Sequence, residues 1–381
     1  MSAPRIFVRS TGAVSAAGTG VEALLQALAD PAWQPQLGIE RPDAPPLPVA
    51  ACREFSPRDV LPPLVARRLD RPARLLAVAA REAIRQLGDP LPWARERVGV
   101  CAGTWNAGTS ALLEVLRAVF LTSPEEAPPA QFPSTVANAP ASQLGILEKL
   151  GGPNLTFAEK QVGGLRAVAE AGRLLTRGRA DATLACSVDE ADWLNAEGYD
   201  RLGTLRTSAH PGMVLAEGAA VLVLACEPGP APLAVLAGWG SASGPAAPHR
   251  YPDDPAPLVA ACRQALERSG LAPGEVGLVV SLANGIPVLA DLERRALSAL
   301  FGTYRPAAVG TAERLGEGAV AGALRTLVAT HAVGVGARLA WEPPASLTAA
   351  GFPPATAPVR AALIPGLAGG GSAVALVLTA P

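Results

Sequence analysis

The amino-acid sequence predicts an α/β protein built from two similar halves, and three observations lead to that class. The 381 residues are 49% hydrophobic and 17% charged, enough apolar material for a deep core and too much for a disordered chain. Apolar runs of strand length alternate with amphipathic segments of helix length, as in sheets covered on both faces. This order occurs twice, so we place the halves at 1–230 and 231–381, although they share no visible sequence similarity.

The first half begins with a short apolar strand, followed by a proline-studded stretch over 31–63. A helix is expected at 67–87, where apolar residues recur at helical spacing with arginines on the opposite face. Prolines mark a further loop at 124–133. Continuous apolar runs predict the strands and amphipathic periodicity predicts the other helices. The expected strands are 6–8, 98–103, 155–159, 182–188 and 219–227, and the further helices are 110–121, 140–150 and 162–177.

The second half repeats this alternation and ends on a pair of strands. Its apolar runs and its amphipathic segments are recognised by the same two signals as in the first half. The expected strands are 233–239, 276–282, 307–309, 359–364 and 373–379, and the expected helices are 258–269, 288–301 and 317–333.

Charge and composition exclude several classes of function. The net charge is −1 and the basic residues form no cluster, which argues against nucleic acid and anionic lipid as partners. No apolar run reaches 18 residues and the first residues lack a secretory pattern, so we expect a cytoplasmic protein. The five cysteines form no CxxC pair and the three histidines lie far apart. We therefore expect reduced thiols, no metal site and no cofactor.

One segment carries a specific resemblance. Residues 151–190, GGPNLTFAEKQVGGLRAVAEAGRLLTRGRADATLACSVDE, resemble the nucleophile segment of the β-ketoacyl synthases, in which a strand enters a sharp elbow ahead of a buried helix. The segments 132–153, 215–224 (LAEGAAVLVL) and 367–378 (LAGGGSAVALVL) resemble other parts of that family. The resemblance implies a thiolase fold, with five layers αβαβα from two duplicated halves and the elbow at 152–164.

The resemblance also implies a catalytic centre that this chain lacks. Family members acylate a cysteine at a helix N-terminus and use two histidines to stabilise the malonyl carbonyl oxygen during decarboxylation. Counting from Gly152 and Pro153, the cysteine position falls on Gln161, which cannot form a thioester. The lysine that orients the second histidine segment is also missing. The first histidine is replaced by Leu282, Ala283 or Asn284, and the second by Gly316 or Glu317.

Glutamine at this elbow has two uses in the family. Some synthases with glutamine keep both histidines and decarboxylate malonyl carrier protein. The other use is in the chain length factor, the inactive partner subunit of type II polyketide ketosynthases. AEKQVGGL at 158–165 resembles that subunit, apart from Lys160 and Val162, and the missing histidines favour it. The alternatives are a decarboxylase and an inactive scaffold of the same fold. The chain's short length, together with the absence of an aromatic-rich tunnel wall, favours the branch that makes reduced polyene chains.

The chain length factor interpretation implies partners and a tunnel. The partners would be a catalytic ketosynthase subunit in a heterodimer and an acyl carrier protein that holds the growing chain. Thr109, Leu112 and Leu116 would face the tunnel from one side of a helix, although the same spacing also fits ordinary core residues. Trp193 matches another position at the tunnel end. Gln131 and Phe132 would reach toward the partner's acyl pocket.

Three polar positions have plainer interpretations. Gln161 would satisfy backbone groups beside the interface, or else bind a malonyl group if catalytic histidines were nearby. Glu217 is interpreted as a buried structural acid. Asp189 and Glu190 are expected to cap the next helix.

Overall fold

The computed structural model describes residues 4–41, 44–356 and 358–381, and its strands form two halves with the same order. Each half places its own third, second, fourth, fifth and first strands side by side. The first set is β7 (Asn154–Phe157), β6 (Val98–Gly103), β8 (Ala182–Asp189), β10 (Gly218–Ala225) and β1 (Phe7–Ser15). The second set is β13 (Ala307–Val309), β12 (Leu278–Val280), β14 (Ala361–Leu367), β15 (Ser372–Thr379) and β11 (Ala234–Ser243).

The directions of the strands repeat as well. In each half the second strand is parallel to both of its neighbours, and the last strand along the chain is antiparallel to its two. The two sets meet where Phe7 and Val8 of β1 pair with Val235 and Ala234 of β11. The repeated order supports the duplication that the sequence rhythm predicts.

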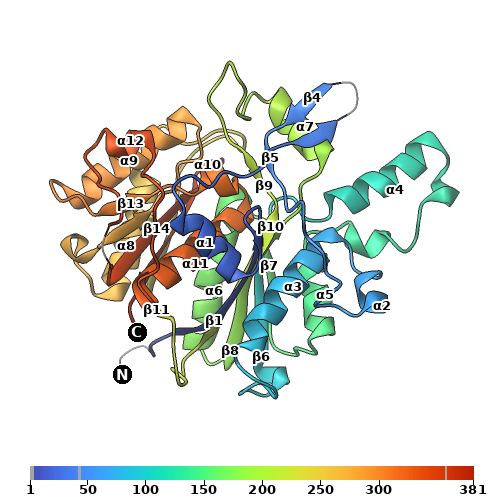
Figure 1. Ribbon diagram of the computed structural model, residues 1–381, viewed down its shortest axis with the longest axis horizontal. Helices are drawn as coiled ribbons and strands as arrows, with labels where there is room; N and C mark the ends of the chain where they lie inside the picture. The colour runs from blue at the N-terminus through green and yellow to red at the C-terminus, as the bar shows by residue number, and fades with distance from the viewer. Residues whose placement is uncertain (1–3, 42–43, 357) are drawn as a thin grey trace.

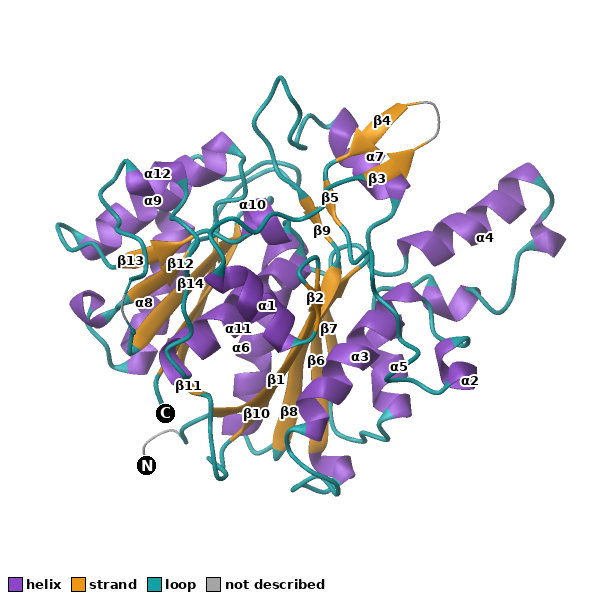
Figure 2. Cartoon of the chain, in the orientation of Figure 1, coloured by secondary structure: helices purple, strands orange, loops and turns teal. Residues whose placement is uncertain are grey.

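Helices cover the outer faces of the two strand sets and fill the space between the sets (Figure 2). The central layer is α6 (Gly163–Thr176) with α11 (Ala319–Gly334). The outer layer of the first half is α3 (Arg71–Arg85) with α5 (Ala139–Leu147), and that of the second is α8 (Ala256–Ser269) with α9 (Pro287–Phe301). Side chains of these helices and strands pack into three hydrophobic clusters that lie between the layers. This is the five-layered α/β arrangement that the resemblance implies.

Smaller elements surround this body. The helix α4 (Thr109–Leu121) projects away from it, at the opposite side from the chain termini (Figure 1). The other helices are α1 (Val21–Ala29), α2 (Pro63–Ala66), α7 (Trp193–Arg201), α10 (Ala312–Leu315) and α12 (Ala345–Thr348). The short strands are β2 (Gly18–Thr19), β3 (Ile39–Arg41), β4 (Ala44–Leu47), β5 (Val49–Ala50) and β9 (Leu215–Ala216).

The expected elements are mostly present, and the exceptions have physical causes. β6 and β13 occupy the expected residues, whereas β1 continues far beyond 6–8. Its sequence, FVRSTGAVS, contains no apolar run, because the polar residues Ser10 and Thr11 occupy two of its buried positions. The helix α1 was not expected, whereas α7 is the helix expected after Asp189 and Glu190, and the stretch 31–63 holds short strands as well as loops. No helix among the described residues has the length and apolar character to cross a bilayer.

Glycine allows the two central helices to approach closely at their first turns. A Cβ atom on Gly164 of α6 would lie 2.4 Å from the carbonyl oxygen of Ala319 at the start of α11. No side chain fits at that distance, so this contact requires glycine. The close approach brings the N-terminal ends of α6 and α11 together, where the candidate site lies.

Candidate functional site

The predicted elbow is a sharp turn between β7 and α6. Lys160 has φ +49°, a left-handed conformation that is unfavourable for a residue with a side chain. Its ammonium group donates hydrogen bonds to the carbonyl oxygens of Pro248 and Gly369, the latter at 3.1 Å. Gln161 follows in a short 3₁₀ turn and is only 7% exposed. The elbow therefore aims Gln161 into the protein, while Lys160 holds the turn against two loops of the second half.

Gln161 contacts the second half through a tyrosine. Its side-chain Nε2 donates a hydrogen bond to the hydroxyl of Tyr251 at 3.1 Å. Its buried Oε1 has no hydrogen-bond partner among the described residues. Burial raises the pKa of Tyr251, and the nearby carboxylate of Glu317 raises it further, so the phenol stays protonated.

A second polar pair lies beside this tyrosine. The side-chain Nδ2 of Asn284 donates to Oε2 of Glu317 at 3.0 Å, and the backbone N–H of Gly318 donates to Oε1 at 2.9 Å. Glu317 is 2% exposed, and burial raises its pKa to about 7. The charge of Arg325, which is also buried, partly offsets that effect. The carboxyl group of Glu317 is therefore poised between its neutral and charged forms near neutral pH.

The segment before Asn284 is fixed by a different acid. Glu293, which is completely buried, accepts hydrogen bonds from the hydroxyl of Ser281 at 2.6 Å and from the backbone N–H of Leu282 at 2.8 Å. Leu282 and Ala283 are buried apolar residues, and Gly316 only forms a turn with φ +85°. Of the candidate replacements for histidine, the structure thus brings Asn284 and Glu317 together.

Tyr251 was not recognised from the sequence. This residue lies in a proline-rich stretch without a motif, and its contact with Gln161 joins positions 90 residues apart. Arg325 was also missed, because an arginine within an otherwise apolar helix pattern gives no clue to its buried acidic neighbours.

Among the described residues, neither the five cysteines nor His331 can replace the missing nucleophile and base. Burial raises the pKa of every cysteine, to about 12 for Cys101 and Cys262, which disfavours the reactive thiolate. Burial lowers the pKa of His331 to about 4, and its ring contacts the hydroxyl of Thr11 at 2.9 Å, away from the elbow. Within the described residues, no three His, Cys, Asp or Glu side chains are grouped to hold a metal ion.

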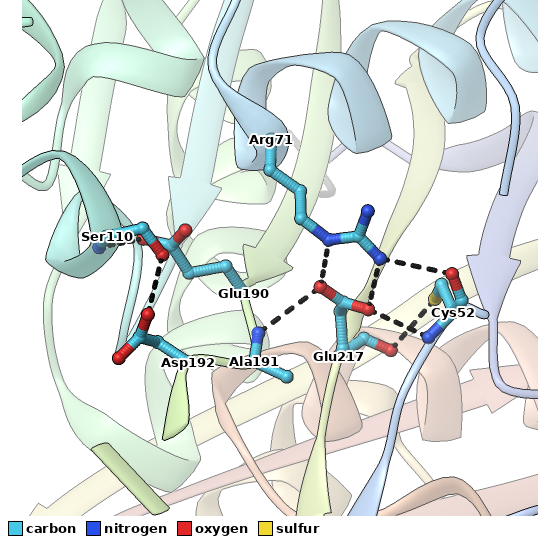
Figure 3. A network of polar contacts seen from close by, with 7 residues as sticks. All are labelled: Cys52, Arg71, Ser110, Glu190, Ala191, Asp192 and Glu217. Atoms are coloured by element: carbon cyan, nitrogen blue, oxygen red, sulfur yellow. Dashed lines mark hydrogen bonds and ion pairs between the residues drawn. The ribbon is translucent and has the colours of Figure 1, made fainter. Parts of the chain in front are cut away.

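Glu217 lies at the centre of a separate network (Figure 3). Its carboxylate forms an ion pair with Arg71, with 2.5 and 2.7 Å contacts, and accepts hydrogen bonds from the backbone N–H groups of Cys52 and Ala191. The side chain is 1% exposed and all of its partners are protein groups. This geometry agrees with the interpretation of Glu217 as a structural acid that ties three separate chain segments together.

The two acids at the end of β8, Asp189 and Glu190, hold different helices from the one expected. Oδ2 of Asp189 accepts from the backbone N–H of Val320 at the start of α11, at 2.9 Å. Glu190 accepts from the backbone N–H of Ser110 in the first turn of α4, and burial raises its pKa to about 6 (Figure 3). The expected cap of the next helix, α7, is instead made by Asp192, whose carboxylate accepts from the backbone N–H of Leu194 at 2.8 Å. The expectation for Asp189 and Glu190 was wrong because they bind helices distant in sequence.

Of the predicted tunnel residues, Thr109, Leu112 and Leu116 lie on α4, and Trp193 lies on α7. The hydroxyl of Ser110 donates to Asp192 at 3.2 Å, so the first turn of α4, with Thr109, lies near the first turn of α7, with Trp193. Leu112 is 41% exposed and Leu116 39%, so neither is an ordinary core residue of this chain.

Gln131 and Phe132 lie in a 3₁₀ turn that contacts α4. The ring of Phe132 is largely exposed. Exposed apolar side chains therefore lie on α4, around the turn at Phe132, on α5 and on the edge strand β7, elements that contact one another in that order. The members of this apolar surface are Leu112, Leu116, Phe120, Leu121, Phe132, Val136, Ile146 and Leu155.

Comparison with known families and proteins gives two kinds of match. The model "Beta-ketoacyl synthase, N-terminal domain" matches residues 57–227, and the corresponding C-terminal domain model matches residues 233–331. A 3-oxoacyl-[acyl-carrier-protein] synthase 2 of Coxiella burnetii is 27% identical over 361 residues, which cover 87% of this chain and 86% of that protein. The synthase 2 of Vibrio cholerae is 30% identical over 95 residues, covering 25% of this chain and 23% of its own.

Solved structures match over almost the entire chain. The ishigamide ketosynthase/chain length factor has a TM-score of 0.86 at 18% identity and complete coverage of both chains. A ketosynthase in complex with its chain length factor from Xenorhabdus doucetiae has a TM-score of 0.82 at 22% identity, covering 99% of this chain and 98% of the other. A β-ketoacyl synthase from Burkholderia phymatum has a TM-score of 0.87 at 18% identity, covering 99% of each chain. At these identities the likeness establishes the fold.

Proposed function

This chain belongs to the β-ketoacyl synthase family and has its thiolase fold, and from that premise we propose that it is a chain length factor, the non-catalytic subunit of a two-chain ketosynthase. One observation carries the proposal. The elbow holds Gln161, bonded to Tyr251, and the neighbouring helix start holds a pair formed by Asn284 and Glu317. These four side chains contain neither a thiol nor an imidazole.

The chemistry of these groups opposes condensation at this elbow. The amide of Gln161 has no acidic proton to lose near neutral pH and cannot accept an acyl group as a thioester. Decarboxylation of a malonyl thioester requires donors directed at the oxygen where negative charge develops. Glu317 is an acceptor when ionised and would repel that charge. The amide donors of Asn284 and Gln161 are already engaged by Glu317 and Tyr251, which also counts against the malonyl decarboxylase alternative.

The exposed apolar surface supports the pairing with a second subunit. β7 is the edge strand of its sheet, with unpaired backbone groups along one side, and Leu155 on it is 39% exposed. Exposed apolar side chains on α4 and on the turn at Phe132 continue this surface. Contiguous patches of this kind mark protein interfaces. In our proposal a catalytic ketosynthase covers the patch, and the acyl chain, tethered to a carrier protein, extends between the subunits past α4.

Reconstitution with a ketosynthase tests the proposal. The chain is co-expressed with a ketosynthase that has the cysteine and both histidines, and the complex receives malonyl carrier protein. Mass spectrometry of carrier-bound products should show chain extension by the complex and none by this chain alone. A complex whose ketosynthase lacks its cysteine is the control and should be inactive.

Three results would overturn the proposal. Condensation by this chain alone, at the rate of the complex, would show that it has its own catalytic centre. Formation of acetyl carrier protein from malonyl carrier protein by this chain alone would establish the decarboxylase instead. Elongation by the ketosynthase at the same rate, and to the same product length, without this chain would leave only the scaffold alternative.

A further inference from the structure

A cavity lies at the end of the molecule opposite to the elbow. Its volume is about 540 Å³, and it is bounded by the last turns of α6 and α8 and by the ends of β11 and β15. α6 begins at the elbow and ends at this cavity, so the two sites are separated by about 20 Å of helix. The two chain termini lie at the same end of the molecule (Figure 1). The lining residues are Pro4, Arg5, Arg173, Thr176, Arg177, Val235, Leu236, Ala237, Trp239, Arg268, Ser269 and Thr379.

Four of these residues are arginines and none is acidic. Arg173 forms an ion pair with Glu170 on its own helix, whereas Arg5, Arg177 and Arg268 form no ion pair with described residues. The chain as a whole has a net charge of −1. The concentration of positive charge in this cavity is therefore local, and it is not the consequence of a basic protein.

The arginines come from three parts of the chain, the residues before β1, the end of α6 and the end of α8, and Arg268 is held in place. The guanidinium carbon of Arg268 lies 4.5 Å from the ring centroid of Trp239, and its Nη1 donates to the carbonyl oxygen of the same residue at 2.8 Å. Burial lowers the pKa of Arg268, and the charge of Arg173 lowers it further, which shows that the two guanidinium groups repel one another. The indole N–H of Trp239 is buried without an acceptor among the described residues.

Helix dipoles explain part of this arrangement. Arginine in the last turn of a helix interacts favourably with the carbonyl ends, and Arg173 and Arg268 occupy such positions. That effect does not require two guanidinium groups to lie close enough to repel each other at one cavity, and it does not account for Arg5, which precedes β1. An anion between these groups would remove the repulsion.

We propose that this cavity binds a small phosphorylated anion carrying at least two negative charges. The guanidinium group is the side chain that matches phosphoryl oxygens with paired hydrogen bonds. The volume of about 540 Å³ falls in the range of small-molecule sites. Such a ligand goes beyond the proposed pairing with a ketosynthase, because its site lies away from the elbow and from the apolar surface on α4.

Calorimetric titration of the full chain, or of its co-purified complex, with inorganic pyrophosphate and with ADP tests the proposal. We expect pyrophosphate to bind, and the double variant Arg177→Gln with Arg268→Gln to weaken binding about tenfold or more, since each lost charged contact is worth roughly that factor. The matched control is Arg179→Gln with Arg263→Gln. It removes two exposed arginines close to Arg177 and on the helix of Arg268, neither of which lines the cavity.

The outcomes separate the alternatives. Equal affinity for pyrophosphate and ADP identifies the phosphoryl groups as the recognised part, whereas much tighter binding of ADP adds a contact to the nucleoside. Arg177→Gln alone keeps the stacking of Arg268 on Trp239, so it should still weaken binding if the double variant misfolds. No binding of either ligand to the parent protein, or equal weakening by the control pair, would overturn the proposal. Neither outcome bears on condensation, so this test can fail while the chain length factor proposal stands.

Discussion

Glu317→Gln should change how the stability of the protein depends on pH. In the folded chain, burial raises the pKa of Glu317 to about 7 from its ordinary value of 4.5. The folded state therefore holds this proton more tightly than the unfolded state does. The stabilisation is fully present below pH 4.5 and is lost as pH rises through 7. The gap between the two values corresponds to about 3 kcal/mol, at roughly 1.4 kcal/mol for each pH unit.

The glutamine variant has no charge at this position and so has no such loss. Its amide oxygen still offers an acceptor to Gly318 or Asn284, although not to both in the present geometry. Relative to the parent protein, the variant should gain about 3 kcal/mol of unfolding free energy between pH 4.5 and pH 8. Other buried acids, among them Glu190 and Glu293, are unchanged in the variant, so their titration cancels in the difference; Asp189 is the acid whose charge acts on Glu317.

Urea unfolding followed by tryptophan fluorescence, at several pH values and one protein concentration, measures this difference. Glu267→Gln is the control, because Glu267 is exposed on α8 and its variant should stay within about 0.5 kcal/mol of the parent at every pH. A difference between Glu317→Gln and the parent that does not change from pH 4.5 to 8 would refute the reasoning. It would mean that Glu317 stays ionised beside Arg325 throughout.

Two further predictions concern the proposed subunit itself. Gln161→Cys should give no β-ketoacyl product from this chain alone, because Asn284 and Glu317 occupy the places of the two imidazoles that stabilise the enolate. Mass spectrometry of the products measures this. A condensation product would show that the histidine positions were wrongly assigned to Asn284 and Glu317. In the complex, Leu112→Trp or Leu116→Phe should shorten the carrier-bound products and Leu112→Ala should lengthen them. The cost in stability of the alanine variant should be about 1 kcal/mol, since Leu112 is 41% exposed. Unchanged product lengths with lowered melting temperatures would mean that both leucines only support packing.

Much of the fold could be predicted from sequence because each buried strand and each helix leaves a local signal. The apolar run of β6 and the helical periodicity of α3 are visible in any short window. The repeated strand order was harder to predict, because it depends on pairing between distant segments such as β1 and β10. β1 itself was underestimated, since it buries Ser10 and Thr11 and satisfies Thr11 through His331. A polar strand of this kind is recognisable only when its partners are known.

The site was predictable to the extent that its residues lie in motifs. Counting along the elbow identified Gln161, and the two histidine segments contained Asn284 and Glu317. Tyr251 could not be found, because its role depends on a contact between two loops. The spacing of Leu112 and Leu116 was equally compatible with a tunnel wall and with an ordinary core. Their exposure on α4, which projects from the body of the molecule, excludes the core of this chain, and the tunnel stays a prediction (Figure 1).

The electrostatics of the elbow indicate that a single substitution would not restore its reactivity. The carboxylate of Glu317 raises the pKa of Tyr251, and Tyr251 contacts the side chain of Gln161 directly. A thiolate in place of Gln161 would be exposed to the same negative charge, which raises the pKa of a thiol and reduces its reactive fraction. A family nucleophile is activated by the opposite arrangement, with positive charge or imidazole beside a helix N-terminus. Gln161 and Glu317 are thus mutually compatible, because a neutral amide tolerates a neighbouring carboxylate that a nucleophile would not.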